Sequence, residues 1–126
     1  MKVIENYGRA IESSDENLFK EIFAPQIRLE IPAGASADHP ASAVAHILSQ
    51  VAKTAPGIKC TLTADAGTNW HFLVFEGQLE GQKLQAIDQM HLNKDGKVDQ
   101  GIIYMRPIPV AQKFADAILQ RLQPTR

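Results

Sequence analysis

One acidic residue, Asp88, interrupts a stretch that otherwise alternates like a β-strand with one apolar face. Between residues 83 and 92 this face carries Leu84, Ala86, Asp88, Met90 and Leu92. Burying an ionised carboxylate without a partner is costly, so such a group takes up a proton, finds hydrogen-bond donors or lines a pocket. Asp88 is therefore a candidate for chemistry in a cavity. The alternative is a structural carboxylate that satisfies nearby donors.

A second polar group, the Tyr7 hydroxyl, falls on the apolar stripe of the first segment. Val3, Ile4, Tyr7, Ala10 and Ile11 recur at helical spacing, which predicts an amphipathic helix. Taken alone, such a tyrosine is a core residue with its hydroxyl at the margin of the core. Paired with Asp88, Tyr7 is equally well explained by a role in a pocket.

The histidines do not suggest a metal site. His39 and His46 are seven residues apart, so on one helix they would lie two turns from each other and could not easily share an ion. His71 and His91 are expected on opposite faces of neighbouring strands, and no third ligand accompanies them. We therefore expect neither a metal nor an organic cofactor.

The bulk composition narrows the class of protein. A chain of 126 residues predicts one domain, residues 1–126, and 13 basic against 14 acidic residues give a net charge of -1. This balance argues against nucleic acid or an anionic membrane as a partner. The single Cys60 fits a reducing compartment, and its same-face neighbours Leu62 and Ala64 predict an inert, buried thiol. With no apolar run long enough to span a bilayer, we expect a cytoplasmic protein.

Helical patterns come first along the chain. Ser13, Ser14 and Asp15 supply N-cap chemistry for a second helix, whose buried side would be Leu18, Phe19, Ile22 and Phe23. Pro25 would end it, a short strand would follow through Ile27, Leu29 and Ile31 to Pro32, and residues 33–40 would form a loop. Residues 41–54 predict a third helix, ended by Pro56 and Gly57.

From Ile58 onward the apolar period becomes two, as in strands. Strands are expected at residues 59–66, 70–79, 82–93 and 97–106, as an antiparallel meander. After Pro107 and Pro109, a closing helix would bury Val110, Phe114, Ala117, Ile118 and Leu122. Helices grouped before antiparallel strands indicate an α+β fold with helices on one face of a curved sheet.

A two-residue turn at Glu80 and Gly81 would pair residue 73 with residue 88. The face of Asp88 would then also carry His71, Leu73, Phe75 and Leu79, and the other face Trp70, Phe72 and Val74. Because helices cover only one face, we expect the outer face to form a homodimer interface. A turn longer or shorter by one residue would exchange the residues on the two faces of this strand.

In the order of its elements and in three stretches of residues, the sequence resembles the nuclear-transport-factor-2-like superfamily, in its SnoaL-like and ketosteroid-isomerase branch. Three stretches carry the resemblance: YGRAIESSDENLFKEIFAPQIRLEIP at 7–32, FEGQLEGQKLQAIDQMHL at 75–92 and NKDGKV at 93–98. With the intervening elements they cover most of the chain. The resemblance implies a cone, in which a bent sheet wraps around N-terminal helices, encloses a deep pocket and dimerises. It says less about the reaction, because one fold hosts many activities.

Ketosteroid isomerases hold an enolate oxygen with a tyrosine and a protonated aspartic acid, while a second aspartate moves the proton. The resemblance places Tyr7 and Asp88 in the first two roles. Ile31 stands where the proton-moving acid should be, and without a base a proton is not removed from carbon. Either an ionised Asp88 would act as the base, as an aspartate on this strand is thought to do in SnoaL-like cyclases, or an inward-facing His71 would.

The resulting prediction is a pocket for a small, largely apolar molecule with one carbonyl or hydroxyl group, held by Tyr7 and Asp88. Besides these two, the expected lining residues are Ile31, His71, Phe75, Met90, Ile103 and Met105. Any catalysis would be isomerase, cyclase or lyase chemistry through an enol or enolate. The alternatives are a ligand-binding or dimerisation module without turnover, which Ile31 favours, and a protein-binding groove, to which no residue points.

Overall fold

The chain begins with two helices that place Tyr7 beneath the sheet. In the computed structural model, which describes residues 2–32, 34 and 36–123, these are α1 (Lys2–Ser13) and α2 (Glu16–Ile22). The Asp15 side chain caps α2 by accepting a hydrogen bond from the Leu18 backbone N–H over 3.1 Å. The stripe predicted for α1 is confirmed, because Ile4, Tyr7, Ala10 and Ile11 are all buried.

Two strands follow where one strand and a loop were predicted. Strand β1 (Phe23–Glu30) starts directly after α2 and ends at Glu30, so Ile31 lies just beyond the strand. Strand β2 (Ala37–Pro40) pairs antiparallel with β1, Leu29 opposite Ala37. The prediction of a loop over the whole of 33–40 was therefore wrong. This short, polar edge strand is joined to β1 by backbone pairing and by the ion pair of Arg28 with Asp38, and it has no apolar alternation to reveal it.

The predicted helix over residues 41–54 is two helices, α3 (Ala41–Leu48) and α4 (Val51–Thr54). They are separated at Ser49 and Gln50. The Ser49 hydroxyl donates to the His46 carbonyl oxygen over 2.7 Å, and such a bond competes with the helical backbone pattern. Within the described residues, no helix of the chain is long and apolar enough to cross a bilayer.

The four predicted strands of the meander are confirmed as β3 (Lys59–Asp65), β4 (Trp70–Leu79), β5 (Gln82–Leu92) and β6 (Val98–Arg106). Glu80 and Gly81 form the turn between β4 and β5, with φ angles of 50° and 79°, as a two-residue hairpin requires. The predicted register is also correct, since Leu73 lies opposite Asp88. Asp88 therefore faces the interior.

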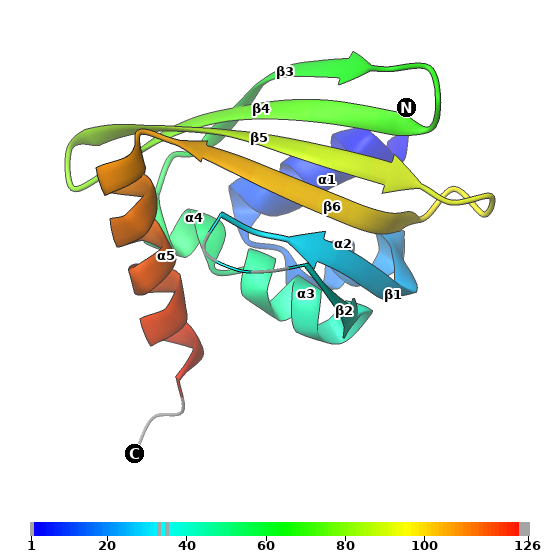
Figure 1. Cartoon of the computed structure of the whole chain (residues 1–126), viewed down its shortest axis with the longest axis horizontal. Helices are drawn as coiled ribbons and strands as arrows, with labels where there is room; N and C mark the ends of the chain where they lie inside the picture. The colour runs from blue at the N-terminus through cyan, green and yellow to red at the C-terminus, as the bar shows by residue number, and fades with distance from the viewer. Residues whose placement is uncertain (1, 33, 35, 124–126) are drawn as a thin grey trace.

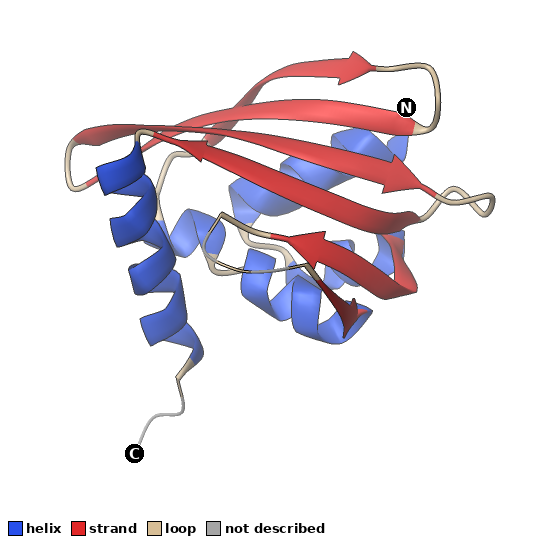
Figure 2. Ribbon diagram, viewed as in Figure 1, coloured by secondary structure: helices blue, strands red, loops and turns tan. Residues whose placement is uncertain are grey.

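The six strands form one curved sheet in the order β2-β1-β6-β5-β4-β3, with the helices on its concave side (Figure 1). β1 pairs with β6 in parallel, and this pairing ends where Glu30 meets Ile102. In the part of the chain that the structure describes, residues 103–106 of β6 thus have no strand partner on the β1 side. The closing helix α5 (Ile108–Leu122) descends from this end of the sheet (Figure 2). The observed architecture confirms the predicted α+β fold.

A β-bulge in β3 changes the predicted environment of Cys60. Cys60 lies opposite Phe75 on the inner face, but Leu62 lies opposite Val74 on the outer face. The extra residue shifts every later side chain to the other face, so Leu62 is 60% exposed. The prediction of a fully buried thiol flanked by apolar neighbours was wrong, because Cys60 is half-buried. Partial burial, the main cause, raises the pKa of its thiol.

The sheet approaches the start of β3 closely at Gly77, and this contact holds Ile58 against the core. A methyl group at position 77 would lie 3.2 Å from Cβ and Cγ1 of Ile58 and 3.3 Å from its Cα. We expect Gly77→Ala to lower the free energy of unfolding by about 1–3 kcal/mol, because a backbone atom and a branched carbon cannot easily move away. Urea unfolding measures this change.

Gly101→Ala is the matched control, since its methyl group would lie 3.1 Å from the flexible end of Met90. We expect a smaller loss of stability, because Met90 can adopt another rotamer. Equal losses for the two variants would contradict the close approach at Gly77.

Candidate ligand pocket and its acid

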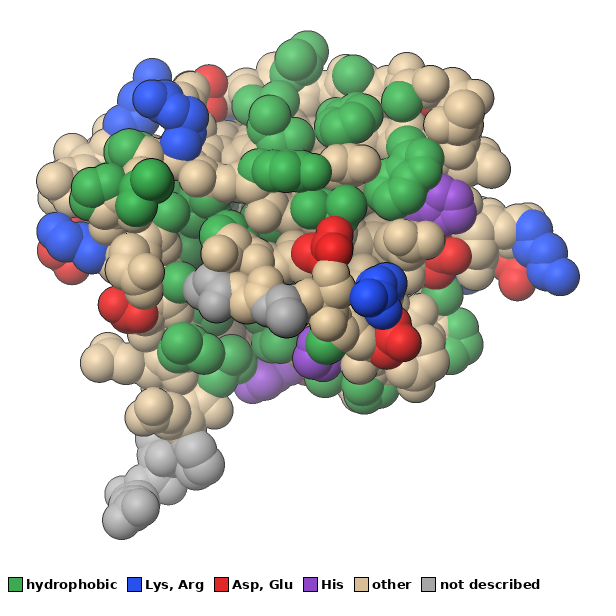
Figure 3. Space-filling model, in the orientation of Figure 1, with side chains coloured by type: hydrophobic (Ala, Val, Ile, Leu, Met, Phe, Trp, Pro, Cys, Tyr) green, Lys and Arg blue, Asp and Glu red, His purple; other side chains and the backbone are tan. Residues whose placement is uncertain are grey.

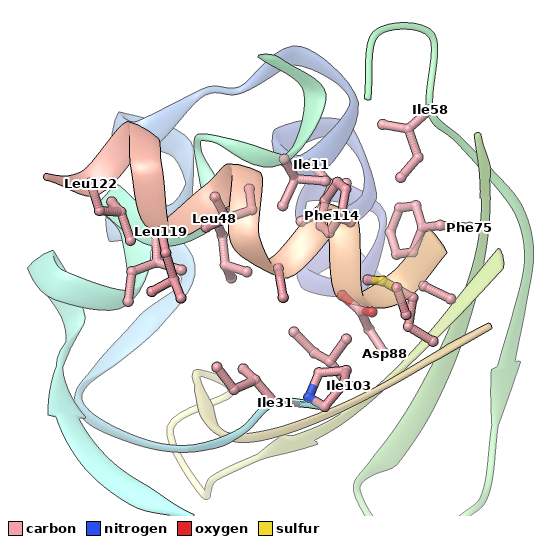
Figure 4. A pocket seen from close by; sticks show the side chains of 18 residues that line it. Ile11, Ile31, Leu48, Ile58, Phe75, Asp88, Ile103, Phe114, Leu119 and Leu122 are labelled. Atoms are coloured by element: carbon pink, nitrogen blue, oxygen red, sulfur yellow. The ribbon is translucent and has the colours of Figure 1, made fainter. Parts of the chain in front are cut away.

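A cavity of about 250 Å³ lies between the inner face of the sheet and helices α1, α3, α4 and α5. Its described lining side chains are apolar with one exception, Asp88. Helix α5 contributes six of them, namely Ala111, Phe114, Ala115, Ile118, Leu119 and Leu122. Figure 4 shows the Asp88 carboxyl pointing into the space between Phe75, Ile103 and Phe114. The pocket is thus a hydrophobic chamber with a single acid.

The carboxyl is held from behind by Tyr7. The Tyr7 hydroxyl donates to Oδ2 of Asp88 over 2.5 Å, and the two residues are 0% and 4% exposed. The Tyr7 ring packs edge-on against Phe19 and Phe75, with centroids 5.7 Å and 6.4 Å apart. Because Tyr7 itself does not line the cavity, Asp88 lies between the phenol and the pocket.

Burial dominates the electrostatics of this pair. It raises the pKa of Asp88 to about 7, and the hydrogen bond from Tyr7 opposes the shift. Burial, together with the charge of Asp88, raises the pKa of Tyr7 well above its ordinary value. The phenol therefore stays protonated as a donor, while Asp88 exchanges a proton near neutral pH.

The other residues predicted for the pocket fall into two groups. Phe75, Ile103 and Met105 line the cavity, as does Ile31, which is 40% exposed at its rim. His71 and Met90 are buried on the same sheet face but do not line this cavity. Met90 instead fills the space beside Gly101. The structure thus gathers four of the six predicted residues around Asp88.

Sequence reasoning did not identify the contribution of α5. This helix carries two overlapping apolar stripes: Val110 and Phe114 pack in a second core cluster with Leu79 and Leu84, while Ala115 and Leu119 face the cavity together with Phe114. Leu119 is 56% exposed. An exposed apolar position next to a buried stripe was the available signal, because a helix that only covers a core needs one stripe.

One ionisable pair, His91 with Asp99, lies on the outer face of the sheet, away from the pocket. There His91 Nδ1 lies 2.6 Å from Asp99 Oδ1, and the His91 ring packs 4.9 Å from that of Trp70. In the part of the chain that the structure describes, no three side chains of His, Cys, Asp or Glu come together as a metal site. The expected positions of His71 and His91 on opposite faces are confirmed.

The raised pKa of Asp88 predicts a pH-dependent stability. The folded state keeps this proton up to a pKa of about 7, whereas an unfolded chain releases it near pH 4. Between these values the folded state binds more protons, so this residue makes the fold less stable as the pH rises. Between about pH 5 and pH 8 we expect a loss on the order of 3 kcal/mol in wild type relative to Asp88→Asn.

Urea unfolding of both proteins at the two pH values checks this difference. The comparison cancels the other titrating groups, which the two proteins share. Parallel changes in wild type and variant would show that Asp88 titrates normally in the folded protein.

Comparison with known proteins supports the architecture. No protein-family model matches the chain, and neither does any curated protein. Among solved structures, a conserved bacterial protein with a cystatin-like fold from Silicibacter pomeroyi is 20% identical with a TM-score of 0.87, covering 94% of this chain and 84% of that chain.

A steroid delta-isomerase from Pseudomonas aeruginosa is 19% identical, with a TM-score of 0.84 and coverage of 96% of this chain and 89% of that chain. An NTF-2-like protein from Burkholderia xenovorans is 14% identical, with a TM-score of 0.70 and coverage of 88% and 89%. At these identities the likeness concerns the fold, and it confirms the resemblance inferred from the sequence at that level. The chain therefore has the curved-sheet α+β fold of the NTF2-like and ketosteroid-isomerase-like proteins.

Proposed function

We propose that this protein binds a small hydrophobic carbonyl compound and moves a proton on it through an enol or enolate, with Asp88 as the base. The observation that carries the proposal is the Asp88 carboxyl, the one polar side chain among the described residues that line an apolar cavity. A base works best when its pKa lies near the working pH. A pKa of about 7 meets that condition.

In the proposed reaction, ionised Asp88 removes a proton from the carbon next to the carbonyl group. The electrons of the C–H bond form the enolate, and protonated Asp88 returns the same proton to another carbon of the conjugated system. Atoms and electrons balance without a cofactor, so the reaction is an isomerisation. A ring closure or a lyase step would share the same first intermediate.

Tyr7 has a different part in this scheme from the one the resemblance implies. Its hydroxyl is occupied by Asp88 Oδ2, and its ring is enclosed by Phe19 and Phe75. We therefore assign it as a positioning residue, which orients Asp88 and lowers the pKa of the carboxyl relative to burial alone. His71 is a poorer base, because it does not line the cavity.

The second candidate is a ligand-binding module without turnover. Ile31 favours it, since an apolar side chain stands at the pocket rim where the resemblance places an acid. In that case protonated Asp88 would donate a hydrogen bond to a ligand oxygen. The proposed setting for either function is the cytoplasm, supported by a half-buried, free Cys60.

We also propose that a second copy of the chain covers the outer face of the sheet. Hydrophobic side chains gather over β3 to β6 in Figure 3, and the exposed ones include Leu62, Ile87 and Tyr104. The polar groups between them are neutral, as in the hydrogen bond from Tyr104 to Gln89. A face with an apolar, uncharged centre can meet its own copy across a two-fold axis without like-charge repulsion.

Asp88→Asn tests the catalytic proposal, with 3-cyclohexen-1-one as the probe. Conversion to its conjugated isomer is followed by ultraviolet absorption, and deuterium uptake next to the carbonyl is followed by NMR. We expect the variant to lose at least about a hundredfold in rate, because an amide cannot accept the proton. A variant that keeps the wild-type rate would eliminate Asp88 as the base.

Tyr7→Phe is the companion variant for this test. It removes the hydrogen bond that lowers the pKa of Asp88, so the pH–rate midpoint should move upward while activity is partly kept. A purely structural tyrosine would change the amount of folded protein but not this midpoint. Wild type that binds the ketone in a thermal-shift assay without isomerisation or deuterium uptake would favour the module without turnover.

Light scattering after size-exclusion chromatography tests the homodimer. We expect wild type to be dimeric and the double variant Leu62→Glu, Tyr104→Glu to dissociate, because charges buried at an interface lose hydration without gaining partners. Leu119→Glu is the control, since it changes an exposed apolar residue at the pocket mouth. A monomeric wild type, or equal dissociation in the control, would contradict the assignment.

A further inference from the structure

The Asp88 carboxyl has one oxygen with a partner and one without. Among the described residues, Tyr7 alone donates to it, and the donation goes to Oδ2. Oδ1 has no hydrogen-bond partner there, although the residue is only 4% exposed. An acceptor that has no partner and lies on a carboxyl turned toward a cavity (Figure 4) marks a site that a ligand donor completes.

The pocket also lacks a positive charge to balance this acid. None of its described lining residues is Lys, Arg or His. A carboxylate in apolar surroundings keeps its charge only at a large desolvation cost, which a nearby opposite charge offsets. A ketone brings no such charge, whereas an ammonium group brings both the charge and N–H donors.

We propose that this pocket binds lipophilic amines as their ammonium ions, with the N–H pointing at Asp88 Oδ1 and a compact hydrocarbon group lying along α5. The inference shares the pocket of the proposed function and requires no turnover. Ala115 and Leu119 of α5 and Ile103 of β6 would contact the hydrocarbon group. Their burial supplies the apolar part of the affinity.

The cavity limits the size of the amine. A cavity of about 150 Å³ holds benzene, and this one measures about 250 Å³. One six-membered ring with a two-carbon arm therefore fits, and 2-cyclohexylethylamine is a suitable probe. The ketone 1-cyclohexylpropan-2-one has nearly the same shape without the charge, so it serves as the neutral counterpart.

Few other titratable groups face Asp88 and could mimic its pH response. Tyr7 of α1 stays protonated because its pKa is raised. Cys60 of β3 has a thiol whose raised pKa includes a contribution from Asp88, and His71 of β4 lies two positions from Leu73, the residue opposite Asp88. The elements α1, α3, α4, α5 and β6, and the segment that follows β1, contribute only apolar side chains to the described lining.

Calorimetric titration of the two probes between about pH 6 and pH 8 tests the inference. The amine requires ionised Asp88, so its affinity should rise about tenfold over this range, with release of roughly half a proton at pH 7. The ketone accepts a hydrogen bond from protonated Asp88, so its affinity should fall with rising pH and protons should be taken up. An amine that binds no more tightly at pH 8 than at pH 6 would overturn the proposal.

Asp88→Asn separates charge from shape. An amide keeps the size of the carboxyl and can still donate to a ketone, so we expect the amine to bind about thirtyfold more weakly and the ketone to bind nearly unchanged. Equal losses for both probes would contradict an ion pair. Circular dichroism establishes that the variant is folded, and His71→Gln should leave the pH response of the amine intact.

Ala115→Phe is a second variant, which fills the cavity from α5 without touching Asp88. We expect it to abolish binding of both probes, which ties the calorimetric signal to this pocket. Amine binding unaffected by Ala115→Phe would place the site elsewhere and overturn the proposal. Amine binding together with failed ketone isomerisation would reject the proposed function alone, whereas isomerisation with no amine binding would reject only this inference.

Discussion

The hydrogen bond between Tyr7 and Asp88 joins the first helix to the centre of the sheet, across 81 positions of sequence. Among the described residues neither side chain makes another hydrogen bond, so separating them would leave two buried polar groups unsatisfied. The bond therefore fixes how α1 lies against β5. It also sets where the acid stands relative to the cavity, because Oδ2 faces the phenol and Oδ1 is left for a ligand.

The cavity itself follows from a mismatch between strands. β1 stops pairing at Ile102, while β6 continues to Arg106, so the sheet loses a strand beside its last residues. Ile103 and Met105 then lie next to an open side that α5 covers only in part. Because α5 covers this side of the sheet only in part, an apolar cavity remains there. A sheet that continued, with a helix packed fully against it, would leave a filled core instead.

Much of this could be read from the sequence, because the relevant signals are local. The Glu80–Gly81 turn fixes the register of β4 and β5, and that register alone places Asp88 on the buried face of the sheet, opposite Leu73.

The bulge that exposes Leu62 and the break between α3 and α4 at Ser49 were not predicted, because each depends on backbone hydrogen bonding that the apolar period of the sequence does not record. The second stripe of α5 was missed because cavity-facing and core-facing residues have the same composition. The position of Tyr7 behind Asp88 required the packing of the Phe19 and Phe75 rings, which is a tertiary effect.

The energetics of Asp88 favour a ligand over a structural role. A structural carboxylate stabilises a fold by accepting hydrogen bonds from buried donors. Among the described residues, Tyr7 is the one donor to Asp88, and such a tyrosine–aspartate pair could be replaced by apolar residues at little cost in stability. Between Leu73 and Ile103 an apolar side chain would extend the core, whereas the acid carries a pKa of about 7 and a corresponding loss of stability at neutral pH. Groups that weaken a fold in this way are typical of functional sites. The same desolvation cost favours a ligand that places a hydrogen-bond donor or a positive charge beside Oδ1, because such a ligand offsets the unfavourable free energy of the buried carboxylate.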